Sequence, residues 1–389
     1  MHFSFTEDQE ALRESARVFL ADQSSSERVR AAMVSEIGYD ADVWQRIATE
    51  MGWSAITIPE EYGGLGLGYV ELVALLEEMG AHLLCSPFFS SVCLGANTIM
   101  AAASDEQKRE LLPAIAAGET VATLALTEVD GRWDASGIAT TVRSEGDGLI
   151  LDGAKTFIPD GHVADLFIVA ARQPGSTADD GISLLAVPAD TDGVRRKALP
   201  TMDQTRRQGE AHFDGVRLPE SALLGANRDA WPELRTALQL AAIALAAEQV
   251  GGAARTLAMT VQYAKERVQF GRPIGSFQAI KHKCADMLLR VESARSASYY
   301  AGWAASVSEA DLPLLASLAK AYCSEAYFHC AAESIQIHGG VGFTWEYDVH
   351  LHFKRAKSTE TLLGSPAYHR ELIATGLGLG SGDRKADDG

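Results

Sequence analysis

Cysteine is scarce in this sequence and is placed without a pattern. Five cysteines occur among 389 residues, their number is odd, and none forms a CxxC pair. Their positions are Cys85, Cys93, Cys284, Cys323 and Cys330. A disulfide framework or a zinc site needs cysteines at regular spacing, so neither is expected. We predict a protein of a reducing compartment.

Runs of basic residues are also missing. The formal net charge is −18, and no five consecutive residues are Lys or Arg. Such a field repels a long polyanion, so nucleic acid is not an expected partner. A small anionic ligand could still be held locally, because Lys265, Arg267 and Arg272 lie in one short segment.

The sequence shows neither the pattern of a secretory signal nor a long apolar run. Residues 1–10 are acidic rather than basic and contain no apolar core. The longest apolar stretch, residues 237–247, includes Gln239 and is too short for a hydrocarbon layer of about 30 Å. We therefore expect a soluble, cytoplasmic protein with no membrane partner.

Three regions of different periodicity follow one another. Residues 1–118 show helical spacing, and Thr6 with Gln9 gives the pattern of a capping box. Residues 119–228 hold short β-type runs between Gly, Asp and Pro turns, which predicts a small barrel or sandwich. Residues 229–379 predict a helical bundle, and 380–389 a disordered tail.

The β-type runs are not joined by helical crossovers. The expected strands are 121–126, 149–151, 166–171, 182–187 and 211–213, and the expected long helices that follow are 233–267, 276–306 and 311–338. Without βαβ units, a Rossmann sheet is not available to hold a dinucleotide. The sequence thus predicts helices, then a β-domain, then a bundle.

The segment Tyr263–Gln278 reads YAKERVQFGRPIGSFQ. Arg267 offers a planar fork that suits a pyrophosphate, and Phe270 offers a ring face that can stack on a heterocycle. The alternative is an ordinary charged helix end.

The segment Gln336–Tyr347 reads QIHGGVGFTWEY and packs three glycines into four residues. Glycines let a ligand approach the backbone, whose free N–H groups can bind an anion or a carbonyl. A helix stop would need only one of them. His338 lies inside this segment and could face a cofactor.

Together these two segments and the order of regions closely resemble the acyl-CoA dehydrogenase family. The resemblance covers nearly all of residues 1–377 and rests on the patterns RxxFGxxIxxFQ and QxxGGxGF. It implies an α+β multidomain fold with an all-helical N-terminal domain, a middle β-barrel and a C-terminal four-helix bundle. It also implies FAD as cofactor, an acyl-CoA thioester as substrate, and a tetramer built as a dimer of dimers.

The resemblance assigns the cofactor residues motif by motif. On one subunit it implies contacts to the FAD of a neighbouring subunit from Arg267, Gln269, Phe270, Gln336, Gly339 and Gly340. Beside the flavin ring it places Leu126 and Thr127 on one strand, and Phe157 and Ile158 where the family usually has Trp-Ile-Thr. FAD bound between subunits would need no Rossmann sheet.

The sequence departs from the family at the catalytic base. The family usually carries a glutamate before Gly-Thr, after an Arg-Asp-Ala-Lys helix. The corresponding residues here are Leu363 before Gly364, after Lys354-Arg-Ala-Lys357. A minority of the family places the glutamate on the first bundle helix, where this chain has Ala241.

The flavin-side loop departs as well. It reads Thr127-Glu-Val-Asp-Gly-Arg-Trp-Asp134 where the family has Thr-Glu-Pro-Gly-Ala-Gly-Ser-Asp. Trp133 thus replaces a small serine near the flavin and the pantetheine. We expect Trp133, Leu363 and Gly364 to border the substrate, and Arg206 either to meet the CoA phosphates or to lie in a solvated loop.

Two acids could stand in for the base. Glu248 lies two helical turns from Ala241, roughly 10 Å along the same face, inside an apolar run. A buried acid with a raised pKa would suit a base, and a structural ion pair is the alternative. Glu360 follows KRAK and is expected to pair with it. His350 and His352 make a poor metal pair, and no metal site is expected.

The functional prediction is FAD-dependent α,β-dehydrogenation of an acyl-CoA. The chain could act as a homotetramer that uses Glu248, or as the glutamate-lacking partner in an α2β2 heterotetramer. A flavoprotein with chemistry that needs no α-proton base, or a non-catalytic structural partner, remains as a second class.

Overall fold

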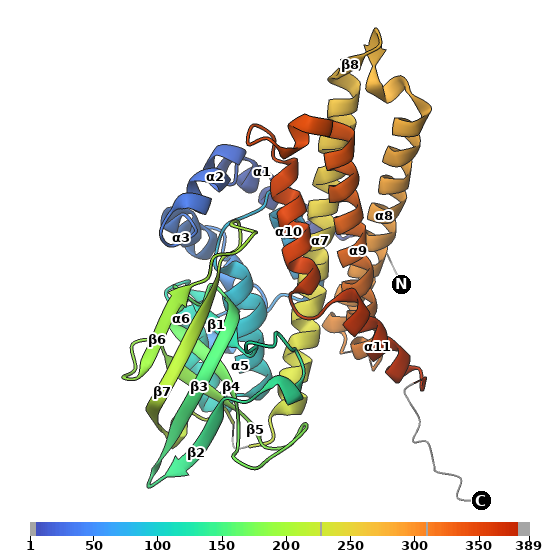
Figure 1. Ribbon diagram of the computed structural model, residues 1–389. Helices are drawn as coiled ribbons and strands as arrows, with labels where there is room; N and C mark the ends of the chain where they lie inside the picture. The colour runs from blue at the N-terminus through green and yellow to red at the C-terminus, as the bar shows by residue number, and fades with distance from the viewer. Residues whose placement is uncertain (1–4, 226–227, 309, 380–389) are drawn as a thin grey trace, which may run out of the picture.

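The computed structural model describes residues 5–225, 228–308 and 310–379. The tail predicted for 380–389 lies outside these residues. The described chain forms helices, then a curled sheet, then a helical bundle (Figure 1). The predicted fold class is confirmed.

The N-terminal region contains six α-helices among its described residues. They are α1 (Glu7–Gln23), α2 (Ser26–Val34), α3 (Ala41–Thr49), α4 (Tyr69–Ala81), α5 (Asn97–Ala102) and α6 (Asp105–Ala116), and the π-helical segment η3 (Phe89–Ala96) leads into α5. The predicted capping box is confirmed, because Thr6 Oγ1 accepts from the Gln9 N–H at 3.3 Å and Gln9 Oε1 accepts from the Thr6 N–H at 2.9 Å. Both bonds satisfy donors that a helix start leaves free.

The middle region is a seven-stranded sheet. Its strands are β1 (Ala122–Ala125), β2 (Thr141–Glu145), β3 (Gly148–Pro159), β4 (Leu166–Arg172), β5 (Ile182–Pro188), β6 (Val194–Ala198) and β7 (Gln208–Pro219), in the order β1-β4-β2-β3-β7-β6 with β5 paired to β4. β1 and β2 each meet β4 in parallel, and the other pairs are antiparallel. All five expected strands are present, and β2 and β6 extend the expected set.

A bulge in the longest ladder shapes one site residue. The β3–β7 register shifts between Lys155 and Ile158, and Phe157 takes a left-handed φ of 56° there. An extra residue at a bulge re-aims the neighbouring side chains. Ile158 therefore enters the sheet core at 1% exposure, whereas Phe157 remains 41% exposed.

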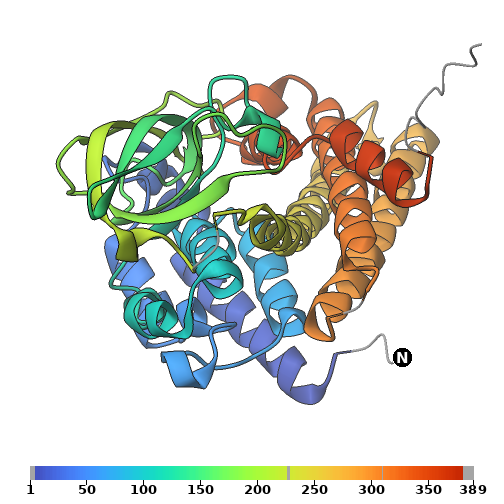
Figure 2. The ribbon, with the colours of Figure 1, turned by 90° about the horizontal axis from the view of Figure 1, so that it is seen from below.

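The C-terminal region is the predicted bundle. Its helices are α7 (Trp231–Glu266), α8 (Gln278–Ser306), α9 (Leu312–His338), α10 (Val349–Thr361) and α11 (Pro366–Gly376), and the hairpin β8 (Val268–Gln269) and β9 (Arg272–Pro273) joins α7 to α8. α7 lies at the centre, with the sheet to one side and α8 and α9 to the other (Figure 2). By length and composition α7 could cross a membrane, but 78% of its most apolar window is buried, as in the core helix of a soluble protein.

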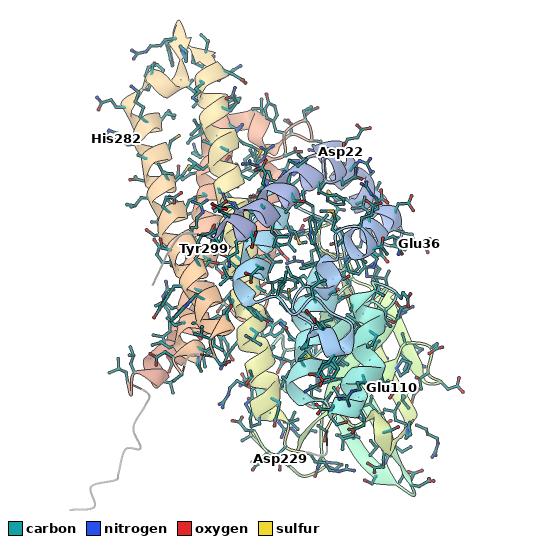
Figure 3. All side chains as sticks on the ribbon, turned by 180° about the vertical axis from the view of Figure 1, so that it is seen from behind. Asp22, Glu36, Glu110, Asp229, His282 and Tyr299 are labelled. Carbon is teal, nitrogen blue, oxygen red and sulfur yellow. The ribbon has the colours of Figure 1, made fainter. Side chains whose placement is uncertain are left out.

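α7 approaches α4 closely through glycine. A Cβ on Gly80 would lie 2.0 Å from the carbonyl oxygen of Glu248, and one on Gly251 would lie 1.7 Å from that of Glu77. Only glycine fits such a contact. Glu77 also binds α8, accepting from Arg295 Nε at 2.9 Å and Tyr299 Oη at 2.5 Å. Tyr299 is labelled in Figure 3, where α8 passes the N-terminal helices. These contacts fix the helical region against the bundle.

Candidate functional site

The larger of two neighbouring cavities lies between the bundle and the loop after β1. Its volume is about 740 Å³. α7 contributes Arg235 and Ala242, α11 contributes His369, and the corner after α10 contributes Leu363. Ala241, beside Ala242, is fully buried. Both positions where the family carries its base therefore lie at or next to this cavity.

A smaller cavity of about 230 Å³ lies on the other side of the same corner. Its walls include Thr127 from the loop after β1, Phe157 from β3 and Leu362 from the corner. Thr127 is tied to β3, because its Oγ1 donates to the Thr156 carbonyl at 2.6 Å and its own carbonyl accepts from the Thr156 N–H at 2.9 Å. The structure thus brings together Thr127 and Phe157, which the sequence placed beside a flavin ring.

Trp133 lines both cavities. The loop that carries it is held at several points, since Arg132 pairs with Asp134 at 2.9 Å and Glu128 pairs with the buried Lys155 at 2.8 Å. Burial lowers the pKa of Lys155 to about 8. Leu126, by contrast, is buried in the helical core at 2% exposure and lines neither cavity.

The corner that follows α10 has an unusual backbone. Leu363 has φ 61° and Gly364 has φ 99°. The Gly364 N–H donates to the Thr361 carbonyl at 3.1 Å, and the Leu363 carbonyl accepts from His369 Nε2 at 2.9 Å. Among the described residues no acceptor is found for the N–H of Leu363, a residue only 4% exposed. This corner therefore contains an unpaired backbone donor in a residue that lines the larger cavity.

Lys320 on α9 hydrogen-bonds to the backbone of the same corner. Its ammonium donates to the Gly364 carbonyl at 3.1 Å, the Glu360 carbonyl at 3.3 Å and Ser324 Oγ at 3.0 Å. The side chain is fully buried, and no carboxylate of a described residue pairs with it. Burial lowers the pKa of Lys320 to about 7, and burial together with nearby Lys320 lowers that of His369 to about 4.

Glu248 belongs to a buried ion-pair network at the junction of sheet, α7 and α10. Arg355 Nη1 meets Glu248 Oε1 at 2.7 Å and Arg355 Nε meets Asp203 Oδ2 at 2.9 Å, while Arg206 Nη2 binds the other oxygen of Glu248. Burial alone would raise the pKa of Glu248, but Arg206 and Arg355 lower it overall. The pKa of Glu248 is thus lowered and not raised, and the side chain forms the ion pair that was the alternative to a base.

Arg206 is likewise not where one prediction placed it. It is only 9% exposed, and its guanidinium lies 4.6 Å from the centre of the Phe89 ring as well as on Glu248. The prediction of a solvated loop is wrong, because the ion pair draws this segment into the protein. Glu248 and Arg206 line a separate void of about 10 Å³ and neither of the two cavities. Glu360 pairs with Lys357 at 2.6 Å, as expected.

The two glycine- and arginine-bearing segments meet at one end of the bundle, away from the sheet (Figure 1). Tyr263 joins them, because its ring stacks on His338 at 4.2 Å and its hydroxyl donates to the His338 carbonyl at 3.3 Å. His338 is thereby buried against Tyr263. The residues that protrude are Arg267, Gln269, Phe270, Gln336, Gly339 and Gly340.

Their exposure suits a ligand that is shared with another chain. Phe270 is 92% exposed, at φ 52°. A Cβ on Gly339 or Gly340 would meet nothing within 4 Å, so the backbone is open to an approaching group. This end of the bundle and the two cavities form separate regions of the described chain. Among described residues, no group of three His, Cys, Asp or Glu could hold a metal ion.

Several functional candidates were missed from the sequence. Lys320, His369, Asp203 and Arg355 were not singled out, because long-range packing rather than local pattern brings them together. Arg355 could have been noticed, since it takes the place of Asp in the family's Arg-Asp-Ala-Lys.

Comparisons with known proteins agree on one family. Models of the acyl-CoA dehydrogenase N-terminal, middle and C-terminal domains match residues 6–119, 123–216 and 231–378. Acyl-CoA dehydrogenase IpdE2 of Mycolicibacterium smegmatis is 34% identical over 361 residues, covering 93% of this chain and 96% of that protein.

Solved structures give the same result. Butyryl-CoA dehydrogenase from Megasphaera elsdenii superposes with a TM-score of 0.90 at 28% identity, over 97% of this chain and 100% of that one. The ChsE4–ChsE5 complex from Mycobacterium tuberculosis contains a chain with a TM-score of 0.86 at 28% identity, over 97% and 99% of the two chains.

Proposed function

The chain belongs to the acyl-CoA dehydrogenase family of FAD-dependent oxidoreductases, and we propose that it works as the glutamate-lacking subunit of a heterotetramer. Leu363 and Ala241 occupy the two base positions, and Glu248 is neutralised by two arginines. ChsE4–ChsE5 is itself a complex of two differently named chains. A companion chain would supply the carboxylate that this chain lacks, in the cytoplasm.

The residues present fit FAD. Thr127 and Phe157 border a cavity of ring size at the sheet, and the exposed Arg267 and Phe270 are free to meet the cofactor of a neighbouring subunit. Open backbone at Gly339 and Gly340 allows the adenylate part of FAD to approach. Bound FAD would accept the hydride from the β carbon of the thioester.

The backbone corner at Leu363 is the group that would polarise the thioester carbonyl. An α C–H is acidic enough only when the adjacent carbonyl is polarised in the transition state. The unpaired N–H of Leu363, held at the cavity wall, is a suitable donor for that oxygen. This free donor is the observation that carries the proposal of a thioester site.

Coenzyme A would need a cation as well. Arg206 is committed to Glu248, whereas Arg235 is exposed, lines the 740 Å³ cavity and is the one Lys or Arg among its described lining residues. We assign the phosphate contact to Arg235 in place of Arg206.

Co-expression tests the subunit role. The chain is purified alone and together with the product of a neighbouring acyl-CoA dehydrogenase-like gene, and the flavin absorbance and mass of each preparation are measured. We expect stable flavin and acyl-CoA-dependent bleaching only in the heteromer. A yellow homotetramer that bleaches alone, and loses bleaching in Glu248→Gln, contradicts the proposal. A flavin never bleached by acyl-CoA would favour different chemistry, and a colourless complex a structural role.

A further inference from the structure

We propose that Lys320 and His369 are positioning residues which fix the Leu363 corner so that its N–H points to the thioester carbonyl. This inference rests on the proposed function, because it assumes that a thioester binds in the 740 Å³ cavity. The proposal gives a function to two buried polar side chains that do not belong to the ion-pair network around Glu248.

The corner needs external support because its backbone is strained. A leucine at φ 61° is unfavourable, since a left-handed residue brings its Cβ close to the carbonyl that follows. Such conformations persist only where surrounding contacts over-determine them. His369 holds the carbonyl of Leu363 itself, and Lys320 holds that of Gly364. These bonds fix the two peptide planes after the Leu363 Cα. The chain before it is held as well, because Lys320 also donates to the Glu360 carbonyl and the Leu362 N–H donates to the Ser358 carbonyl. The Leu363 N–H between these fixed segments therefore has little freedom.

Lys320 is anchored in turn by a neutral network. Ser324 Oγ accepts from Lys320 and donates to Gln249 Oε1 at 3.2 Å, and Gln249 Nε2 donates to the Thr359 carbonyl at 3.1 Å. α7, α9 and the end of α10 are therefore joined through hydrogen bonds around one ammonium. A buried ammonium without a carboxylate is costly, so a merely structural role would be filled as well by a neutral side chain.

The Lys320 ammonium also places a positive charge next to the Leu363 corner. Among described residues the titratable groups facing it are Glu360 on α10, Cys323 on α9 and His369 on α11, while α7 contributes the neutral Gln249. The carboxylate of Glu360 is paired with Lys357. Burial raises the pKa of Cys323 to about 12, and that of His369 is about 4, so near neutral pH Lys320 is the group that changes charge.

A chromophoric thioester measures this effect without turnover. The probe is 4-dimethylaminocinnamoyl-CoA, whose absorption moves to longer wavelength when its carbonyl is polarised. It is added to the flavin-loaded assembly, with the companion subunit present, from pH 6 to 8.5. We expect a red shift below pH 7 that declines as pH rises, with a midpoint near 7.

Variants of Lys320 and His369 distinguish a positioning role from a role in stability alone. In Lys320→Met the red shift should be smaller, independent of pH, and accompanied by about tenfold weaker probe binding. In His369→Gln the shift should fall at every pH while its midpoint stays. Lys197→Met, which removes an exposed lysine on β6 that lines neither cavity, is the control and should match the unmodified protein.

Each result decides the matter. An unchanged shift and midpoint in Lys320→Met overturn the inference while the proposed function stands. If that variant does not fold, Lys320→Arg replaces it, and its permanent charge should keep the red shift constant up to pH 8.5. A flat titration in the unmodified protein also overturns the inference. An assembly that holds flavin but never binds the probe overturns the thioester site itself.

Discussion

Replacing Glu248 by glutamine distinguishes an ion pair from a catalytic base. Glu248 is 4% exposed and serves as counter-ion to Arg206 and Arg355. Removing one member of a buried ion pair costs about 3–5 kcal/mol, because the remaining charge is left uncompensated. Arg355 keeps Asp203, whereas Arg206 loses its one ion pair among the described residues and keeps the Phe89 ring, and its Nη1 already lacks a partner. Glutamine preserves the volume, so we expect a loss of about 3 kcal/mol.

The assay is equilibrium unfolding in urea of the flavin-loaded assembly at fixed protein concentration. Glu50→Gln is the control, because its exposed pair with Arg46 is worth about 0.5 kcal/mol or less. The double variant Glu248→Met with Arg206→Met should recover much of the loss, since an apolar pair needs no counter-charge. A loss below about 1 kcal/mol together with abolished flavin bleaching would refute the ion-pair argument and identify Glu248 as the base.

Four further outcomes follow from the same structure. Phe270→Ala should weaken FAD retention by about tenfold in a flavin-release assay without changing the melting temperature of the flavin-free protein, because this ring is 92% exposed. Gly80→Ala should cost about 3 kcal/mol in urea unfolding, because the methyl group would meet the Glu248 carbonyl, whereas an unchanged midpoint contradicts the close packing. Arg235→Ala should raise the acyl-CoA Kd about tenfold but leave that of the dephosphorylated pantetheine thioester unchanged. Burial sets the pKa of Lys320 near 7, below its unfolded value, so the unfolded chain binds more protons between about pH 7 and 10; stability relative to Lys320→Met should rise across that range and stay flat below it.

Much of the fold could be predicted from local pattern. Long apolar periodicity placed α7, α8 and α9 within a few residues of their bounds, and β-type runs placed five strands. Thr6 and Gln9 gave the first helix start correctly. Within the helical region predicted for 1–118, no separate helix was predicted over residues 89–102, the π-helical segment and α5, because a nearly uniform apolar stretch has no helical period to detect.

The candidate site could be predicted only in part. Motifs singled out Thr127 and Phe157, which line one cavity, and Leu363, which lines the next. Leu126 and Ile158 share those motifs but face a core, because strand alternation and a bulge set side-chain direction. Lys320 and His369 carry no local signal, since a lysine within an alanine-rich helix usually reaches solvent.

The altered α10 sequence and the buried Glu248 have a common explanation. The resemblance aligns Arg355 with the aspartate of Arg-Asp-Ala-Lys, so a cation now stands where the family has an anion. A fully buried guanidinium requires negative partners, and Asp203 in the loop between β6 and β7 and Glu248 on α7 provide them. Glu248 is then needed because Arg355 and Arg206 are present. Its burial in an apolar run, the feature that made it resemble a base, therefore follows from the charge reversal at 355 and gives no independent support for a catalytic role.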